Sequence, residues 1–137
     1  MDRSSLRRCL AAALPLALAA ALAAAAALAT IGVIEKEGLL ERALEAGEIF
    51  REGLQQFVDQ YDQVLEVRGD GLMVGLVLDV PAADLVAKCR EMGLLACVAG
   101  GNTMRFLPPL TVKDDELEEA VDIISDALDM LYGEDAE

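Results

Sequence analysis

Arg105 is the residue of this chain whose type and position most clearly suggest chemistry. It interrupts an apolar segment, Thr103–Leu107, that lies between a Gly-Gly-Asn turn and Pro108-Pro109. In an alternating strand, an arginine at this point can simply face the solvent. Alternatively, a rigid strand presents its planar guanidinium to a carboxylate, which it holds through two parallel hydrogen bonds. The residue pattern alone leaves both interpretations open.

The composition excludes several kinds of catalytic and binding site. The chain of 137 residues contains no histidine, so it has no histidine general base, histidine-ligated metal or histidine-activated nucleophile. Its formal net charge of −14 argues against a nucleic-acid partner, because nucleic-acid binding needs clustered cations. Aromatic residues make up only 4% of the chain, which argues against stacking platforms for bases or sugars.

The cysteines, lysines and carboxylates offer no clear catalytic group. Cys9, Cys89 and Cys97 form no C-x-x-C pair, so we expect free thiols, with the last two as small core residues. The lysines are expected at helix ends and on a polar helix face, where nothing lowers the pKa of an imine-forming amine; they are Lys36, Lys88 and Lys113. Acidic residues mostly follow helical spacings, which is typical of a solvated surface. We therefore predict no catalytic residue, cofactor-binding residue or metal ligand.

Glycines 69, 71 and 75 only superficially match a dinucleotide-binding fingerprint. Their spacing is G-x-G-x-x-x-G, and a strand follows rather than the helix whose N-terminus would meet a pyrophosphate. We interpret Gly69–Gly71 as a turn. The tripeptide Arg68-Gly69-Asp70, which spells an adhesion motif, is interpreted as chance.

The elements expected to position Arg105 follow the order α-α-β-β-α-β-β-α. Apolar periodicity predicts helices over residues 39–60 and 113–132, and Asp79-Val-Pro81 is expected to begin a shorter helix that Gly93 ends. Apolar, β-branched runs predict strands at 64–68, 72–78, 94–98 and 103–107. Short hairpins imply an α+β fold. Its small, mainly antiparallel sheet of three to four strands is covered by helices on one face and preceded by a long Ala-rich helix.

Each of these helices is expected to bury one apolar stripe. For the helix over 39–60 the stripe is Leu40, Ala43, Leu44, Gly47, Phe50, Leu54 and Phe57. For the shorter helix it is Leu85, Val86, Cys89 and Met92, and for the last helix it is Leu117, Ala120, Val121, Ile124, Leu128 and Leu131. Gly47 and Gly53 are expected to allow close packing.

Residues 1–30 are predicted to be a separate segment, and residues 31–137 the folded domain. From Leu10 to Ala29 the chain contains only Ala, Leu and Pro15, after a net-basic start. This matches a secretory signal in outline and is just long enough to span a bilayer. However, alanine is nearly neutral for membrane insertion, and the run continues without a polar junction into helix-compatible residues. A signal or anchor and an ordinary domain helix with an atypical start both remain open.

Three segments, at residues 32–42, 67–75 and 93–111, occur together in an order and spacing known from one family. They resemble the C-terminal small domain of class III pyridoxal-phosphate aminotransferases of the acetylornithine and ornithine type, over about residues 25–131. The resemblance implies a cytoplasmic, homodimeric parent enzyme of fold type I. That enzyme moves an amino group from an amino-acid substrate to 2-oxoglutarate in arginine biosynthesis, with pyridoxal phosphate as electron sink. It also implies that Arg105, in an R-F-x-P-P motif, helps to hold a substrate carboxylate.

Departures from the family pattern shape what we expect of this chain. The large domain, which carries the imine-forming lysine and the cofactor-binding groups, has no counterpart here. Ala20 and Ala21 stand where the family has Asn and Pro, and Ala24 stands where it has Cys. We therefore expect a C-terminal fragment that binds no pyridoxal phosphate and is inactive alone. The alternatives are a non-enzymatic domain, secreted or membrane-anchored through residues 1–30, and a small amino-acid-binding regulatory module.

Overall fold

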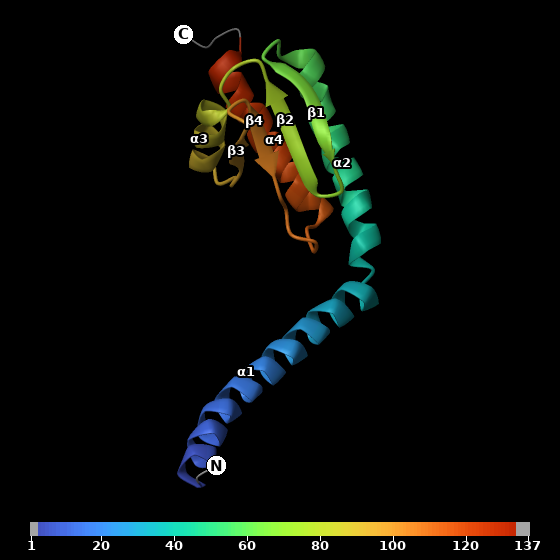
Figure 1. Cartoon of the computed structure of the whole chain (residues 1–137). Helices are drawn as coiled ribbons and strands as arrows, with labels where there is room; N and C mark the ends of the chain where they lie inside the picture. Colours follow the sequence, from blue (N-terminus) through green and yellow to red (C-terminus); the bar gives the residue numbers. More distant parts are fainter. Residues whose placement is uncertain (1–2, 134–137) are drawn as a thin grey trace. The chain divides into compact units, whose positions relative to one another are not determined.

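The computed structural model describes residues 3–133, with side chains from residue 15 onward, and divides the chain into two units (Figure 1). The first unit, Met1–Gly38, contains the helix α1 (Arg3–Lys36), and the second, Leu39–Glu137, contains every other element. The expected free thiol of Cys9 lies outside the described side chains.

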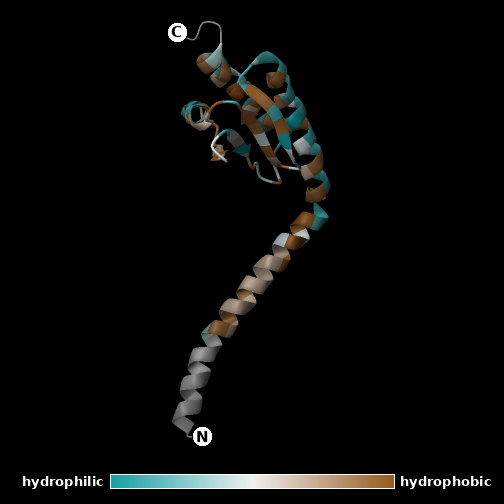
Figure 2. Cartoon of the chain, turned by 45° about the horizontal axis from the view of Figure 1, so that its top comes forward, coloured by the Kyte–Doolittle hydropathy of each residue, from teal (hydrophilic) through white to brown (hydrophobic). Residues whose placement is uncertain are grey.

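α1 is one continuous helix of 34 residues. Alanine has the highest helix propensity, so this composition favours a helix without a packing partner. The helix contains Pro15, and its leucines at 16, 22 and 28 are exposed. The described part of α1 is apolar over most of its length (Figure 2), and Pro15–Lys36 is long and apolar enough to cross a membrane. The expected long Ala-rich helix is thus confirmed.

The second unit is built on a four-stranded antiparallel sheet with the strand order β1-β2-β4-β3. Its elements are α2 (Leu39–Gln60), β1 (Val64–Asp70), β2 (Met73–Leu78), α3 (Ala83–Glu91), β3 (Cys97–Ala99), β4 (Thr103–Phe106) and α4 (Asp114–Tyr132). The α+β fold and the element order predicted from the sequence are confirmed.

One face of the sheet forms the hydrophobic core. Alternate residues of β2 and β4 belong to the core cluster, namely Val74, Leu76, Leu78, Met104 and Phe106. They pack with buried residues of α2 and α4, and these two helices lie behind the sheet in Figure 1. Since side chains alternate along a strand, the residues between them lie on the opposite face, which we call the open face.

Two glycines bring α2 close to its neighbours, as predicted. A Cβ atom at Gly47 would lie 2.1 Å from the carbonyl oxygen of Gly71, in the turn between β1 and β2. A Cβ atom at Gly53 would lie 2.9 Å from a methyl group of Val121 on α4. The helix therefore rests directly on the backbone of the β1–β2 turn, which fixes the start of β2.

The predicted apolar stripe of α2 is wrong in its first turns. Leu40 and Leu44 are 65% and 59% exposed, whereas Ala46 is fully buried with Phe50 and Leu54. A helix turns about 100° per residue. The core-facing side of α2 is therefore centred on Ala46, Phe50 and Leu54, and Leu44 lies outside it, on the exposed flank. In α4 and α3 the predicted stripes are buried, except for the half-buried residues Val121, Leu131 and Met92.

Two predicted boundaries around α3 are also wrong. The helix begins at Ala83 rather than at Asp79-Val-Pro81, because backbone hydrogen bonds hold the preceding segment in place. The N–H groups of Asp79 and Ala82 donate to the carbonyl oxygens of Gln63 and Gly101, at 3.0 Å each. The predicted strand 94–98 is shorter and later, Cys97–Ala99, because the N–H of Leu94 donates to the end of α3.

Candidate functional site

Arg105 lies on the open face, on a strand that has a neighbour on each side. It is paired with Gly75 of β2 and with Cys97 of β3. The adjacent residues of β4, Met104 and Phe106, are buried in the core, so the Arg105 side chain faces away from it and is exposed. This outward position is compatible with both interpretations of the sequence, a solvated arginine and a carboxylate ligand.

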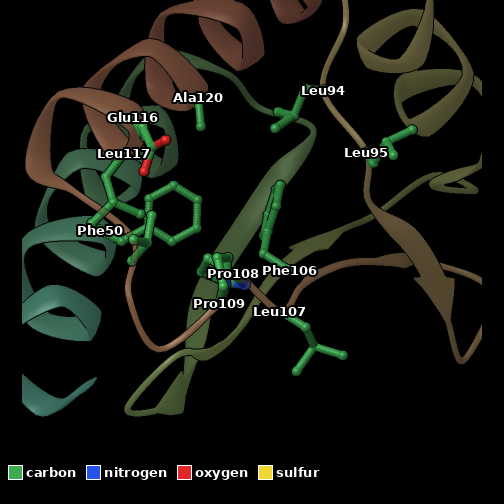
Figure 3. A pocket seen from close by; sticks show the side chains of 11 residues that line it. Phe50, Leu94, Leu95, Phe106, Leu107, Pro108, Pro109, Glu116, Leu117 and Ala120 are labelled. Carbon is green, nitrogen blue, oxygen red and sulfur yellow. The ribbon is translucent and has the colours of Figure 1, made fainter. Parts of the chain in front are cut away.

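The motif around Arg105 is anchored from the other face of the sheet. The ring of Phe106 meets that of Phe50 edge to face, with centroids 5.2 Å apart and an interplanar angle of 88°. Both rings line an apolar cavity of about 250 Å³, together with Pro108 and Pro109 (Figure 3). Glu116 is the one charged residue that lines it. Packing on this side fixes β4 and therefore the position of Arg105.

A groove of about 500 Å³ surrounds Arg105 on the open face. Its lining includes Arg68 of β1, Gly75 of β2 and Thr103 of β4. The guanidinium of Arg68 donates a hydrogen bond from Nη2 to Oγ1 of Thr103, at 3.1 Å. Because Gly75 has no side chain, it forms the floor of the groove between the two arginines.

Arg68 and Thr103 are site residues that the sequence analysis missed. The two-residue turn at Gly71-Leu72 fixes the β1–β2 register, which places Arg68 opposite Gly75. This hairpin register is the sequence signal for Arg68, whereas residues 68–70 taken alone indicate only a chance tripeptide. The predicted turn is confirmed at Gly71, while β1 continues through Gly69 to Asp70.

None of the three lysines contributes to the lining of this groove. Lys36 is the last residue of α1 and is exposed, and Lys113 is exposed just before α4. Lys88 forms an ion pair with Glu91, 3.2 Å away on the same helix. None of them lines the groove around Arg105 or the apolar cavity.

The two described cysteines differ in their surroundings. Cys89 is fully buried in the core, as predicted, and burial raises the pKa of its thiol to about 11. Cys97 is only half-buried, which corrects the prediction, because β3 is an edge strand. Among residues 15–133, no three acidic or cysteine side chains are grouped so that they could hold a metal ion.

Comparison with known proteins gives one consistent family. The model of the family "Aminotransferase class-III" matches residues 18–128. Acetylornithine aminotransferase from Caldanaerobacter subterraneus subsp. tengcongensis is 42% identical over 96 residues, which is 69% of this chain and 24% of that protein. The chain thus spans about a quarter of the length of this relative.

Solved structures agree with the sequence comparison. Acetylornithine aminotransferase from Elizabethkingia anophelis matches with a TM-score of 0.69 and 31% identity, over 74% of this chain and 28% of the other. Lysine aminotransferase from M. tuberculosis, in the internal aldimine form, matches with a TM-score of 0.71 and 34% identity, over 74% and 24%. The chain is therefore similar to one part of each of these proteins.

Proposed function

The chain belongs to the class-III aminotransferase family, and from this premise we propose that it serves as the C-terminal small domain of an acetylornithine-type transaminase. In that role Arg105 binds the carboxylate of an amino-acid substrate. The family depends on pyridoxal phosphate, which acts as the electron sink for amino-group transfer. The proposed working form is a homodimer in the cytoplasm.

The position of Arg105 is the observation that supports this proposal. Within residues 15–133, Arg42, Arg51 and Arg68 each form an ion pair with a carboxylate, whereas Arg90 and Arg105 form none, and of these two only Arg105 lies on a strand. Its strand is hydrogen-bonded on both sides and packed from below by Phe106. A planar guanidinium on such a strand can donate parallel hydrogen bonds to both oxygens of a carboxylate without first breaking another ion pair.

We propose that the groups that hold pyridoxal phosphate are supplied from outside these 137 residues. The support is the placement of the three lysines, none of which lies beside the groove. The chain alone is then inactive. Mixed with pyridoxal phosphate, N-acetylornithine and 2-oxoglutarate, it should form no glutamate above a blank without protein. Glutamate formation above that blank would overturn this part of the proposal.

A chimera tests the role of Arg105 directly. Residues of this chain replace the matched segment of the Caldanaerobacter acetylornithine aminotransferase, and transamination is measured. Replacing Arg105 by Met removes a charge-assisted, two-point contact, so we expect KM for the carboxylate substrate to rise about tenfold or more. Arg90, which is exposed on α3, provides the matched control Arg90→Met. An unchanged KM in the Arg105→Met chimera would contradict the proposed role.

A second candidate function is a domain anchored to a membrane or secreted through residues 1–30. One observation favours it, the exposed apolar helix Pro15–Lys36. The family match beginning at residue 18 supports instead a helix of the aminotransferase domain. Cell fractionation separates the two candidates. Recovery in membranes, or cleavage near residue 30, would favour the second one, whereas an intact chain in the cytosol supports the first.

A further inference from the structure

We propose that the apolar cavity beside Phe106 is a binding site for a small aromatic amine, whose ring enters the cavity and whose ammonium group contacts Glu116. The cavity lies on the helix-covered side of the sheet, whereas Arg105 lies on the open face. The inference therefore goes beyond the proposed function and does not depend on the role of Arg105.

The lining of the cavity suits an aromatic ring. The rings of Phe50 and Phe106 meet edge to face, and two prolines and Leu117 extend the apolar wall (Figure 3). A third ring gains further edge-to-face or offset contacts with such a pair. Among the described residues that line the cavity, Glu116 is the only one with a polar side chain. Water in this space finds few hydrogen-bond partners, so an apolar group displaces it easily.

The size and the rim of the cavity limit the ligand. A closed apolar cavity of about 150 Å³ holds benzene, so about 250 Å³ has room for one ring with a short side chain. Leu95 and Leu107 also line the cavity and are 80% and 58% exposed. Exposed leucines at the rim favour the entry of an apolar group from solvent. A single-ring arylalkyl compound therefore matches this site.

The charge at the cavity favours a cationic head group. One carboxylate oxygen of Glu116 accepts a hydrogen bond from the N–H of Lys113, at 2.9 Å, and its second oxygen accepts none within residues 15–133. In the same turn Asp114 is paired with Arg42, whereas Asp115 and Glu116 form no ion pair among these residues. An ammonium group at Glu116 donates a charge-assisted hydrogen bond, and a ligand carboxylate there is repelled.

The test compares 2-phenylethylamine with 2-phenylethanol and phenylacetate, which carry the same ring and differ in charge. The full chain, labelled with ¹⁵N, is titrated at low salt, and NMR follows the amides of Leu95, Leu107 and Leu117. We expect a Kd of about 1 mM or lower for the amine. The alcohol should bind about threefold to tenfold more weakly, because the ion pair is partly solvated, and phenylacetate should bind most weakly.

Two matched variants of α4 test the role of Glu116. Glu116→Gln removes the charge but keeps an oxygen that can accept the hydrogen bond from Lys113, so the start of the helix is preserved. In this variant the amine and the alcohol should bind within about twofold of each other. Glu118→Gln makes the same change at an exposed residue that does not line the cavity, and the preference for the amine should remain.

A third variant tests the cavity itself. Ala120→Leu extends a larger side chain from the cavity wall and should weaken binding of the amine at least about tenfold, in a variant whose amide spectrum stays folded. If Ala120→Leu does not fold, the two glutamate variants still decide the outcome. A preference for the amine that disappears only in Glu116→Gln supports the proposal. Equal binding of the amine and the alcohol, or shifts confined to amides outside the cavity, would overturn it.

Discussion

α1 and α2 are both long helices, but they are stabilised in different ways. α1 is rich in alanine, and its described leucines are exposed. α2 alternates charged residues with one buried stripe that includes Phe50 and Leu54. In the first helix local propensity is the main favourable contribution, whereas in the second the contribution comes mainly from burial against the sheet.

This difference shows where a precisely placed side chain can be held. A functional group needs a position fixed by neighbours on several sides, and only the packed unit provides that. The backbone position of Arg105 is fixed by the two strands hydrogen-bonded to β4 and by the Phe50–Phe106 contact on the other face of the sheet. The two units should therefore respond differently to substitution.

The largest expected effect is from removing a core ring. Phe50→Ala should lower the free energy of unfolding by about 3–5 kcal/mol, because it leaves a cavity beneath β4. The matched change in α1, Leu28→Ala, removes a side chain that is 70% exposed and should change stability by less than about 0.5 kcal/mol. Urea unfolding measures the free energy of unfolding of both variants. Similar decreases in the two would contradict the difference between the two helices.

Two glycines provide the next contrast. Gly47→Ala places a methyl group against the carbonyl oxygen of Gly71 and should cost about 1–3 kcal/mol. Gly32→Ala meets nothing within 4 Å and should increase the helix content of α1, with a gain of up to about 1 kcal/mol. Thermal unfolding followed by circular dichroism reports both effects. A neutral Gly47→Ala variant would mean that α2 does not rest on the turn as described.

Alkaline pH should destabilise the packed unit through Cys89. Burial raises the pKa of this thiol to about 11, so the unfolded chain loses its proton first as the pH rises. Stability is therefore complete below the ordinary thiol pKa and falls between about pH 9 and pH 11, by on the order of 1–2 kcal/mol. Burial also raises the pKa of Tyr61 and Tyr132, which act in the same direction. In Cys89→Ala the alkaline loss should be smaller, and an unchanged loss would contradict this assignment.

The smallest expected effect concerns the exposed flank of α2. Leu44→Gln alters a solvent-exposed side chain and should change stability by less than about 0.5 kcal/mol. Leu40 and Leu44 lie one helical turn apart and form an apolar pair on the surface, so their joint replacement by Gln should reduce self-association. Light scattering at high concentration measures this. A large loss of stability would instead place Leu44 in the core, as the sequence suggested.

Element types were predictable because each has a local cause. Apolar periodicity identified α2 and α4, β-branched runs identified β2, and the glycines at 71 and 93 mark a turn and a helix end. What failed depended on contacts distant in sequence. Ala46 rather than Leu44 is buried because of how α2 packs against the sheet. The start of α3 depends on backbone hydrogen bonds from Asp79 and Ala82 to the carbonyl oxygens of residues 63 and 101.

The candidate site was only half predictable for the same reason. Arg105 stood out as a charge within an apolar strand. Arg68 did not, because two strand pairings are needed to place it in one row with Arg105. Arg68 is paired with Gly75, and Gly75 is paired with Arg105. The hairpin register could be inferred from the turn, but the pairing of β2 with β4 joins segments separated by α3 and β3.

The most direct test of the account is amide hydrogen exchange along the intact chain. Its central claim is that residues 39–133 form a cooperative unit that fixes the strand of Arg105, whereas α1 is held by local propensity. We predict slow exchange with a common opening free energy in β2, β4 and the buried faces of α2 and α4, and little protection in α1. Equal protection of α1 and the strands, or an unprotected β4, would contradict the account.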